Sequence, residues 1–239
     1  MNKFISLALL VFVAVSFSTL AFAEKESPTA QSATTPKEEE IPKSGFLGSD
    51  DIYDRLVKTK TKNNKVVYRW KGPKLTKENY NSVLIEDVVL YPAPEPNENV
   101  SEDTLKRISA YTTNLLKEKI GAIVPLADAP GPGVLSMQPA ITGVVIKTEG
   151  MRAYEILPVA AVFGAAKAAT GTRAQEVLVR AEVKFVDSND GELLGAAMRS
   201  IEGEKLKGKK DQLEVEDMQE NLDHSTTEAA SYIQHVFSE

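Results

Sequence analysis

A run of alternating side chains, residues 175–187, constrains the fold of this chain more than any other feature. Apolar side chains occupy every second position of this run, and the positions between them are mostly charged. Such a period of two is typical of a β-strand whose two faces meet different surroundings. One face carries Val177, Val179, Ala181, Val183 and Phe185, and the other carries Leu178, Arg180, Glu182 and Lys184. The Asp190-Gly191 pair that follows favours a tight turn, so we predict an antiparallel hairpin whose second strand spans 192–200.

The remaining apolar patterns predict the other elements of the fold. In chain order these are a short helix at 50–57, a hairpin with strands at 58–62 and 66–70, a strand at 82–91, a helix that starts after Ser101 and ends at Ile120, a strand at 135–147, and a helix at 212–237. Ser101 is a favoured helix-capping residue, and both long helices repeat apolar side chains every three or four residues. We therefore expect an α+β domain: a mainly antiparallel sheet of about 4–6 strands with two long amphipathic helices packed on one face.

The N-terminus has the pattern of a secretory signal peptide. Lys3 precedes an apolar stretch whose unbroken core runs only from Leu7 to Val15, and small residues precede the predicted cleavage between Ala23 and Glu24. A membrane-spanning helix needs about 20 apolar residues. We therefore expect residues 1–23 to be removed after export, and an uncleaved N-terminal anchor is the alternative.

The next segment, residues 24–43, has the composition of a disordered linker. It is rich in Pro, Ser, Thr, Ala and Glu, and Ile41 is its only large apolar residue. Such a segment buries too little apolar surface to offset the entropy lost on ordering. We expect a single folded domain to occupy residues 44–239.

Composition excludes several kinds of chemistry. The chain has no cysteine, so it forms no disulfide, thiolate nucleophile or cysteine-held metal site. Its two histidines, His224 and His235, lie about 16 Å apart along the predicted last helix, which is too far to share a metal ion. The net charge of −6 argues against a dedicated nucleic-acid binder. We predict no catalytic residue, metal site or cofactor.

Residues 55–77 form a strongly basic segment, with nine Lys or Arg side chains and no acidic one. One hypothesis is a contact with an anionic surface, for which the candidate side chains are Lys58, Lys60, Lys62, Lys65, Arg69 and Trp70. The alternative is that the lysines protect the edge of a sheet against aggregation. By contrast, residues 211–239 carry eight acidic side chains and no basic one, which favours a solvated helix face.

An apolar segment rich in Ala and Gly spans Ile156–Thr170. It is too short to cross a bilayer as a helix and contains Lys167. One hypothesis is a buried helix that links two strands; the other is an interface with a partner subunit or a membrane surface. The predicted interface residues are Ile156, Val159, Val162, Phe163 and Ala166.

Five sequence segments, taken in order, resemble a bacterial family of exported proteins catalogued as domain of unknown function 3313. They are Ser44-Gly45-Phe46-Leu47, Tyr80–Tyr91, Asp128–Val134, Pro158–Gly171 and Asp187–Leu194. The resemblance covers roughly residues 44–237 and implies no catalytic residue, because the family has no assigned activity. Many members carry a lipid-modified cysteine shortly before the first segment, and this chain has none. More loosely, the layout is similar to small periplasmic domains that assemble as rings.

Three functions follow as hypotheses. The first is a non-enzymatic exported protein, periplasmic or associated with the outer membrane, that acts through protein–protein contacts in a cell-envelope assembly. Its partner would be another envelope protein or a second copy of the chain. The second is a periplasmic binding module for an anionic ligand or a lipid headgroup, with peripheral membrane contact through the basic segment. The third is a carboxylate-dependent hydrolase, which needs a pair of carboxylates at a defined separation.

Overall fold

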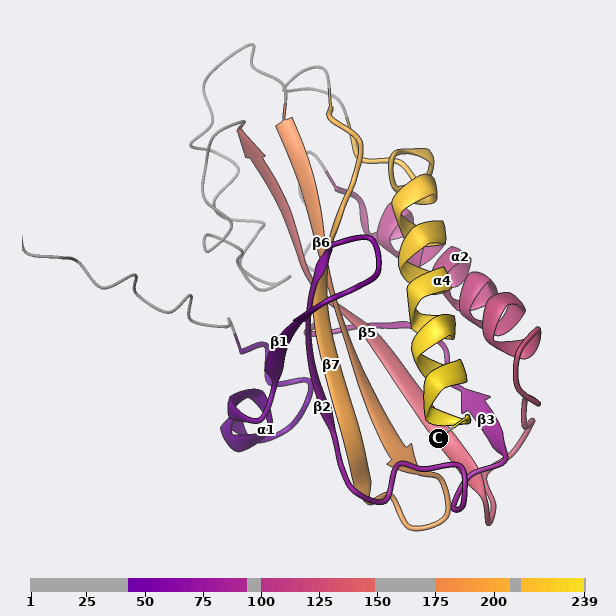
Figure 1. Cartoon of the computed structure of the whole chain (residues 1–239). Helices are drawn as coiled ribbons and strands as arrows, with labels where there is room; N and C mark the ends of the chain where they lie inside the picture. The colour runs from indigo at the N-terminus through magenta and orange to yellow at the C-terminus, as the bar shows by residue number, and fades with distance from the viewer. Residues whose placement is uncertain (1–42, 94–99, 149–174, 207–211, 239) are drawn as a thin grey trace, which may run out of the picture. The chain divides into compact units, whose positions relative to one another are not determined.

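A mixed sheet with two long helices on one face forms the centre of the computed structural model, which describes residues 43–93, 100–148, 175–206 and 212–238 (Figure 1). The elements, in order, are α1 (Asp50–Asp54), β1 (Val57–Lys60), β2 (Val66–Lys71), β3 (Ser82–Ile85), β4 (Val89–Leu90), α2 (Glu102–Gly121), β5 (Val134–Thr148), β6 (Gln175–Asp187), β7 (Leu193–Glu202), the 3₁₀ turn η3 (Glu216–Met218) and α4 (Gln219–Val236). The predicted strand at 175–187 agrees with β6 in both bounds.

The sheet has the strand order β1-β2-β7-β6-β5-β3, and β4 also pairs with β5. All neighbouring pairs from β1 to β5 are antiparallel, whereas β3 and β4 run parallel to β5. The predicted class, a mainly antiparallel sheet, is therefore confirmed. The predicted number of about 4–6 strands is too low, because the described residues form a seven-stranded sheet.

The additional strand arises where the predicted strand 82–91 divides into β3 and β4. Between them, the backbone of Val88 turns away from the sheet toward α2. Its N–H donates to Thr113 Oγ1 at 2.9 Å, and its carbonyl accepts from Ser109 Oγ at 2.9 Å. Two helix side chains thus replace two bonds that a neighbouring strand would have made.

The two long helices, α2 and α4, lie side by side on one face of the sheet (Figure 1). Each buries the apolar stripe that the sequence predicts, including Leu105 and Ile108 from α2 and Leu222 and Ile233 from α4. Ser101 caps α2 by accepting the N–H of Thr104 at 2.9 Å. The last helix begins later than predicted, at Gln219, because Asp217 accepts the N–H of Glu214 and turns the preceding chain into η3.

The opposite face of the sheet is covered in part by the segment from Ser44 to Leu56, which contains α1. Leu47, Ile52 and Tyr53 form a second apolar cluster with side chains of β7. This cover buries Arg180 and Glu182, which are only 2% and 1% exposed. The sheet therefore has packed surroundings on both faces, although the sequence predicts helices on one face alone.

Several predicted features lie outside the described residues. These are the signal peptide at 1–23, the linker as far as residue 42, and the apolar segment Ile156–Thr170 with its predicted interface residues. Within the part of the chain that the structure describes, no helix combines the length and apolar character that a membrane crossing requires.

Candidate functional site

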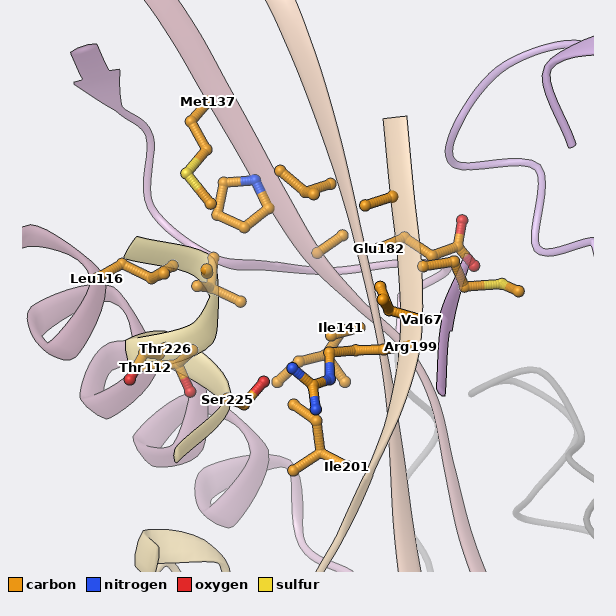
Figure 2. A pocket seen from close by; sticks show the side chains of 18 of the residues that line it. Val67, Thr112, Leu116, Met137, Ile141, Glu182, Arg199, Ile201, Ser225 and Thr226 are labelled. Atoms are coloured by element: carbon orange, nitrogen blue, oxygen red, sulfur yellow. The ribbon is translucent and has the colours of Figure 1, made fainter. Parts of the chain in front are cut away.

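An apolar cavity of about 100 Å³ lies between the sheet and the helices α2 and α4 (Figure 2). Its walls include Val67, Ile141, Val179 and Ala181 from the sheet and Leu116, Leu222 and Ala229 from the helices. A single water molecule needs roughly 10–15 Å³ measured in this way. The cavity therefore has room for part of an apolar ligand.

Two threonines in the cavity wall do not make it polar. Thr112 Oγ1 donates to the carbonyl of Ile108 at 2.7 Å, and Thr226 Oγ1 donates to the carbonyl of Leu222 at 2.8 Å. Each hydroxyl thus bonds to the backbone one turn earlier in its own helix. What these side chains offer a ligand is mainly their carbon atoms.

Two arginines and one glutamate stand at the edge of the cavity. Arg69 of β2 and Arg199 of β7 both line it, and Glu228 of α4 lies beside them. The guanidinium of Arg69 stacks over the ring of Tyr232, with 4.6 Å from its central carbon to the ring centroid. Nη1 of Arg199 bonds Oε2 of Glu228 at 2.7 Å, and these two side chains are only 15% and 10% exposed.

The ion pair between Arg199 and Glu228 leaves hydrogen-bonding capacity unused. Nε of Arg199 and Oε1 of Glu228 are buried and have no hydrogen-bond partner among the described residues. A buried polar atom without a partner costs roughly 1–3 kcal/mol. Such atoms at the edge of a cavity are suited to bonding a polar group that enters it.

Burial and charge also alter the pKa values in this cluster. Burial lowers the pKa of Arg69, and the nearby Arg199 lowers it further, although Tyr232 and Glu228 act in the opposite direction. Burial by itself raises the pKa of Glu228, but the Thr61 hydroxyl and the Arg199 guanidinium outweigh it, so the net pKa is lowered. The cluster thus holds two guanidinium cations and one carboxylate at neutral pH.

A second, polar hollow of about 290 Å³ adjoins the cavity. Its lining includes Asn63 and Lys65 of the β1–β2 hairpin and Asn221 and His224 of α4. The two hollows share Arg199, Ile201 and Ser225. Figure 2 shows the Arg199 guanidinium beside Ser225.

Glu182 lies on the opposite face of the sheet and points away from the helices (Figure 2). Its Oε2 accepts the hydroxyls of Ser44 and Tyr53, both at 2.9 Å, and its Oε1 accepts Thr142 Oγ1 at 2.7 Å. Burial lowers the pKa of the neighbouring Arg180, whereas Glu182 and Tyr53 raise it. Both carboxylate oxygens thus accept hydrogen bonds that connect the N-terminal segment and β5 to β6, which gives Glu182 a structural role.

The structure does not bring the predicted anionic-contact residues together. Side chains alternate between the faces of the β1–β2 hairpin. Lys58, Lys60 and Trp70 therefore lie on the face that carries α1, with Lys58 5.9 Å from the Tyr68 ring centroid. Arg69 lies on the helix-covered face and lines the cavity, Lys65 lines the polar hollow, and Lys62 is exposed in the turn.

The described residues contain no cluster of three or more His, Cys, Asp or Glu side chains that could hold a metal ion. His224 and His235 are both exposed on α4. Sequence reasoning did not find Arg199 and Glu228, which lie on different elements 29 residues apart. The one sequence signal is that Arg199 follows a run of apolar residues in β7.

Comparison with known proteins gives a family and two kinds of relative. The model of a family described as a protein of unknown function, DUF3313, matches residues 42–229. An uncharacterised lipoprotein of Escherichia coli strain K12, YdcL, is 31% identical over 189 residues, which cover 79% of this chain and 84% of the relative. The YdcL lipoprotein of Escherichia coli O157:H7 gives the same values.

A solved structure, a PelC dodecamer from Paraburkholderia phytofirmans, superposes with a TM-score of 0.34 at 12% identity, over 68% of this chain and 96% of that chain. The match to the family model and the identity to YdcL both extend over most of the domain that contains the sheet and the helices. The chain is therefore a member of the DUF3313 family.

Proposed function

We propose that this chain is an exported, envelope-associated and non-enzymatic protein that binds a small ligand with an apolar chain. The observation that carries the proposal is the apolar cavity between the sheet and the helices α2 and α4. The lipoprotein relative supports the export and the association with the envelope. Both oxygens of Glu182 accept hydrogen bonds within the fold, which argues against this buried carboxylate as the acid or base of a hydrolase.

The cavity is placed where a ligand gains the most from burial. Its walls come from the helix-covered face of the sheet and from both long helices, so a bound chain contacts apolar side chains of both layers. Each buried methylene contributes about 0.8 kcal/mol. A short alkyl chain is therefore enough for measurable affinity without any reactive group in the site.

The test is titration of purified residues 24–239 with N-phenyl-1-naphthylamine, an uncharged apolar probe that fluoresces when buried. We expect saturable binding that falls at least tenfold in the variant Ala181→Leu, because a larger side chain on β6 fills the cavity. Ala110→Leu, on the exposed surface of α2, is the matched control and should bind as the natural protein does. Thermal unfolding establishes that each variant folds.

Two results contradict this proposal. One is the absence of saturable binding to the natural protein. The other is undiminished binding to a folded Ala181→Leu variant, which would place the probe elsewhere. Ala229→Leu, on the helix side of the same cavity, provides an independent check of the second result.

A role through protein–protein contacts in an envelope assembly is a separate proposal. It depends on the apolar segment Ile156–Thr170, which lies outside the described residues. Size-exclusion chromatography with light scattering, before and after the substitution Phe163→Asp, tests it. A natural chain that is strictly monomeric and recovers no partner from envelope extracts contradicts it.

A further inference from the structure

We propose that the ligand is an anionic amphiphile with a single alkyl chain, whose acidic head group binds in the polar hollow against Arg199 while its chain occupies the apolar cavity. This inference rests on the proposed function and adds the chemical class of the ligand.

The first observation is that the two hollows meet. Arg199, Ile201 and Ser225 belong to the lining of both, so a molecule at their boundary contacts an apolar space on one side and a polar space on the other. A small hydrophilic anion would gain nothing from the apolar side. A plain hydrocarbon would gain nothing from the polar side. An amphiphile uses both.

The second observation is the incomplete ion pair at the boundary. Nη1 of Arg199 bonds Glu228, while its Nε is buried without a partner among the described residues. Guanidinium groups bind carboxylates and phosphates through two parallel N–H donors. An acidic head group that enters from the polar hollow supplies the missing acceptor for Nε.

The third observation is a surplus of positive charge. Arg199 has Glu228 as its partner, and Lys65 in the polar hollow pairs with Glu202 at 2.9 Å. Arg69 forms no ion pair within the described part of the chain, and its guanidinium lies over the ring of Tyr232. Two guanidinium cations at the cavity, those of Arg199 and Arg69, thus face the single carboxylate of Glu228, and the surplus positive charge matches one negative charge on the ligand.

The size of the cavity also limits which ligands can bind. The cavity volume of about 100 Å³ favours one alkyl chain over the two chains of a bilayer phospholipid. The acidic head group has two chemical sources, the carboxylate of a fatty acid or the phosphate of a single-chain phospholipid. Both present oxygens that Arg199 and Arg69 can bond.

The experiment compares three probes with the same eight-carbon chain, octanoate, octyl phosphate and uncharged octanol, by calorimetric titration of residues 24–239. We expect at least one of the two anions to bind tenfold or more tightly than octanol, and the tighter anion identifies the head group. In Arg69→Gln this preference should fall to less than threefold, because the affinity for the anions falls further than the affinity for octanol. Arg107→Gln, on the exposed side of α2, is the control.

Arg199→Gln alone leaves Glu228 buried without its cation and is expected to unfold more easily. The double variant Arg199→Gln/Glu228→Gln removes both charges together and is the fair test of this position. It should also lose the preference for the anionic probes.

The outcomes separate this inference from the proposed function. Equal binding of octanol and of both anions overturns the inference and leaves the apolar site in place. A preference that survives both Arg69→Gln and the double variant also overturns it, because the anion then binds elsewhere. If none of the three probes binds, the proposed function fails as well.

Discussion

Tyr53 connects the start of the domain to the back of the sheet through a single hydroxyl. It donates to Glu182 at 2.9 Å and accepts the backbone N–H groups of Gly45 and Leu47 at 3.0 and 3.3 Å. Burial raises the pKa of this tyrosine, although the hydrogen bond between its hydroxyl and that of Ser44 acts against that rise. The hydroxyl thus remains protonated and able to donate at neutral pH.

We expect Tyr53→Phe to lower the free energy of unfolding by about 2 kcal/mol, because it leaves buried polar groups without partners. Urea denaturation followed by circular dichroism measures the change. Tyr111→Phe removes a hydroxyl from a partly buried position on α2 and is the control, with an expected loss below about 0.5 kcal/mol. Equal losses of unfolding free energy in the two variants would show that the hydrogen bonds of the Tyr53 hydroxyl do not stabilise the fold.

Glu228 gives the stability of the protein a defined dependence on pH. Its pKa in the fold lies below its ordinary value of 4.5, so its contribution is fully present above pH 4.5 and is lost as the pH falls through the lower folded value. The carboxyl faces Arg199, Arg69 and Thr61. The free-energy difference between the natural protein and Glu228→Gln should be constant from pH 7 to 5 and shrink below pH 4.5.

Denaturant titrations of both proteins across this range measure that difference. Glu118→Gln, on α2, provides a comparison at a carboxyl outside the cluster. A difference that stays constant below pH 4.5 would mean that Glu228 titrates alike in the folded and unfolded chains.

Among the helices and strands, the best predicted are those whose sequence pattern depends only on neighbouring residues. The alternation at 175–187 and the capped helix after Ser101 agree with β6 and α2 because each depends on neighbouring residues alone. The strand predicted at 82–91 divides because Thr113 and Ser109 of α2 bond the backbone of Val88. These hydrogen bonds join residues more than twenty positions apart in the sequence, so no local pattern predicts them.

We expect Thr113→Val to lower the free energy of unfolding by about 1–2 kcal/mol, since the Val88 N–H loses its buried acceptor while the side-chain shape is kept. Hydrogen exchange at the Val88 amide should accelerate in parallel. Thr113 Oγ1 also donates to the carbonyl of Ser109, four residues earlier in its helix, at 3.0 Å. Thr227→Val is the control, because Thr227 Oγ1 donates in the same way to the carbonyl of Asp223 at 2.8 Å but lies on the exposed surface. An unchanged exchange rate at the Val88 amide would contradict the stabilising role of the hydrogen bond from Val88 to Thr113.

At the scale of the whole molecule, the candidate site depends on contacts that the sequence does not display. The basic segment 55–77 contains Arg69, but the pleat of β2 sends that residue toward the helices and its neighbour Trp70 toward the other face. Glu228 belongs to a strongly acidic helix whose charges suggest solvent exposure, yet it pairs with Arg199 under the β1–β2 hairpin. Only the assembled sheet and helices bring these charges to one cavity.

A ligand held between the two layers should stabilise both of them at once. At a concentration one hundred times its dissociation constant, a ligand adds about 2.7 kcal/mol to the free energy of unfolding. For a domain of this size, that corresponds to an increase of roughly 5–10 °C in the melting temperature. We expect the tighter of octanoate and octyl phosphate to give this increase in calorimetric scans of residues 24–239. Ala181→Leu should show less than a quarter of it, and an equal increase in that variant would place the binding site outside the cavity.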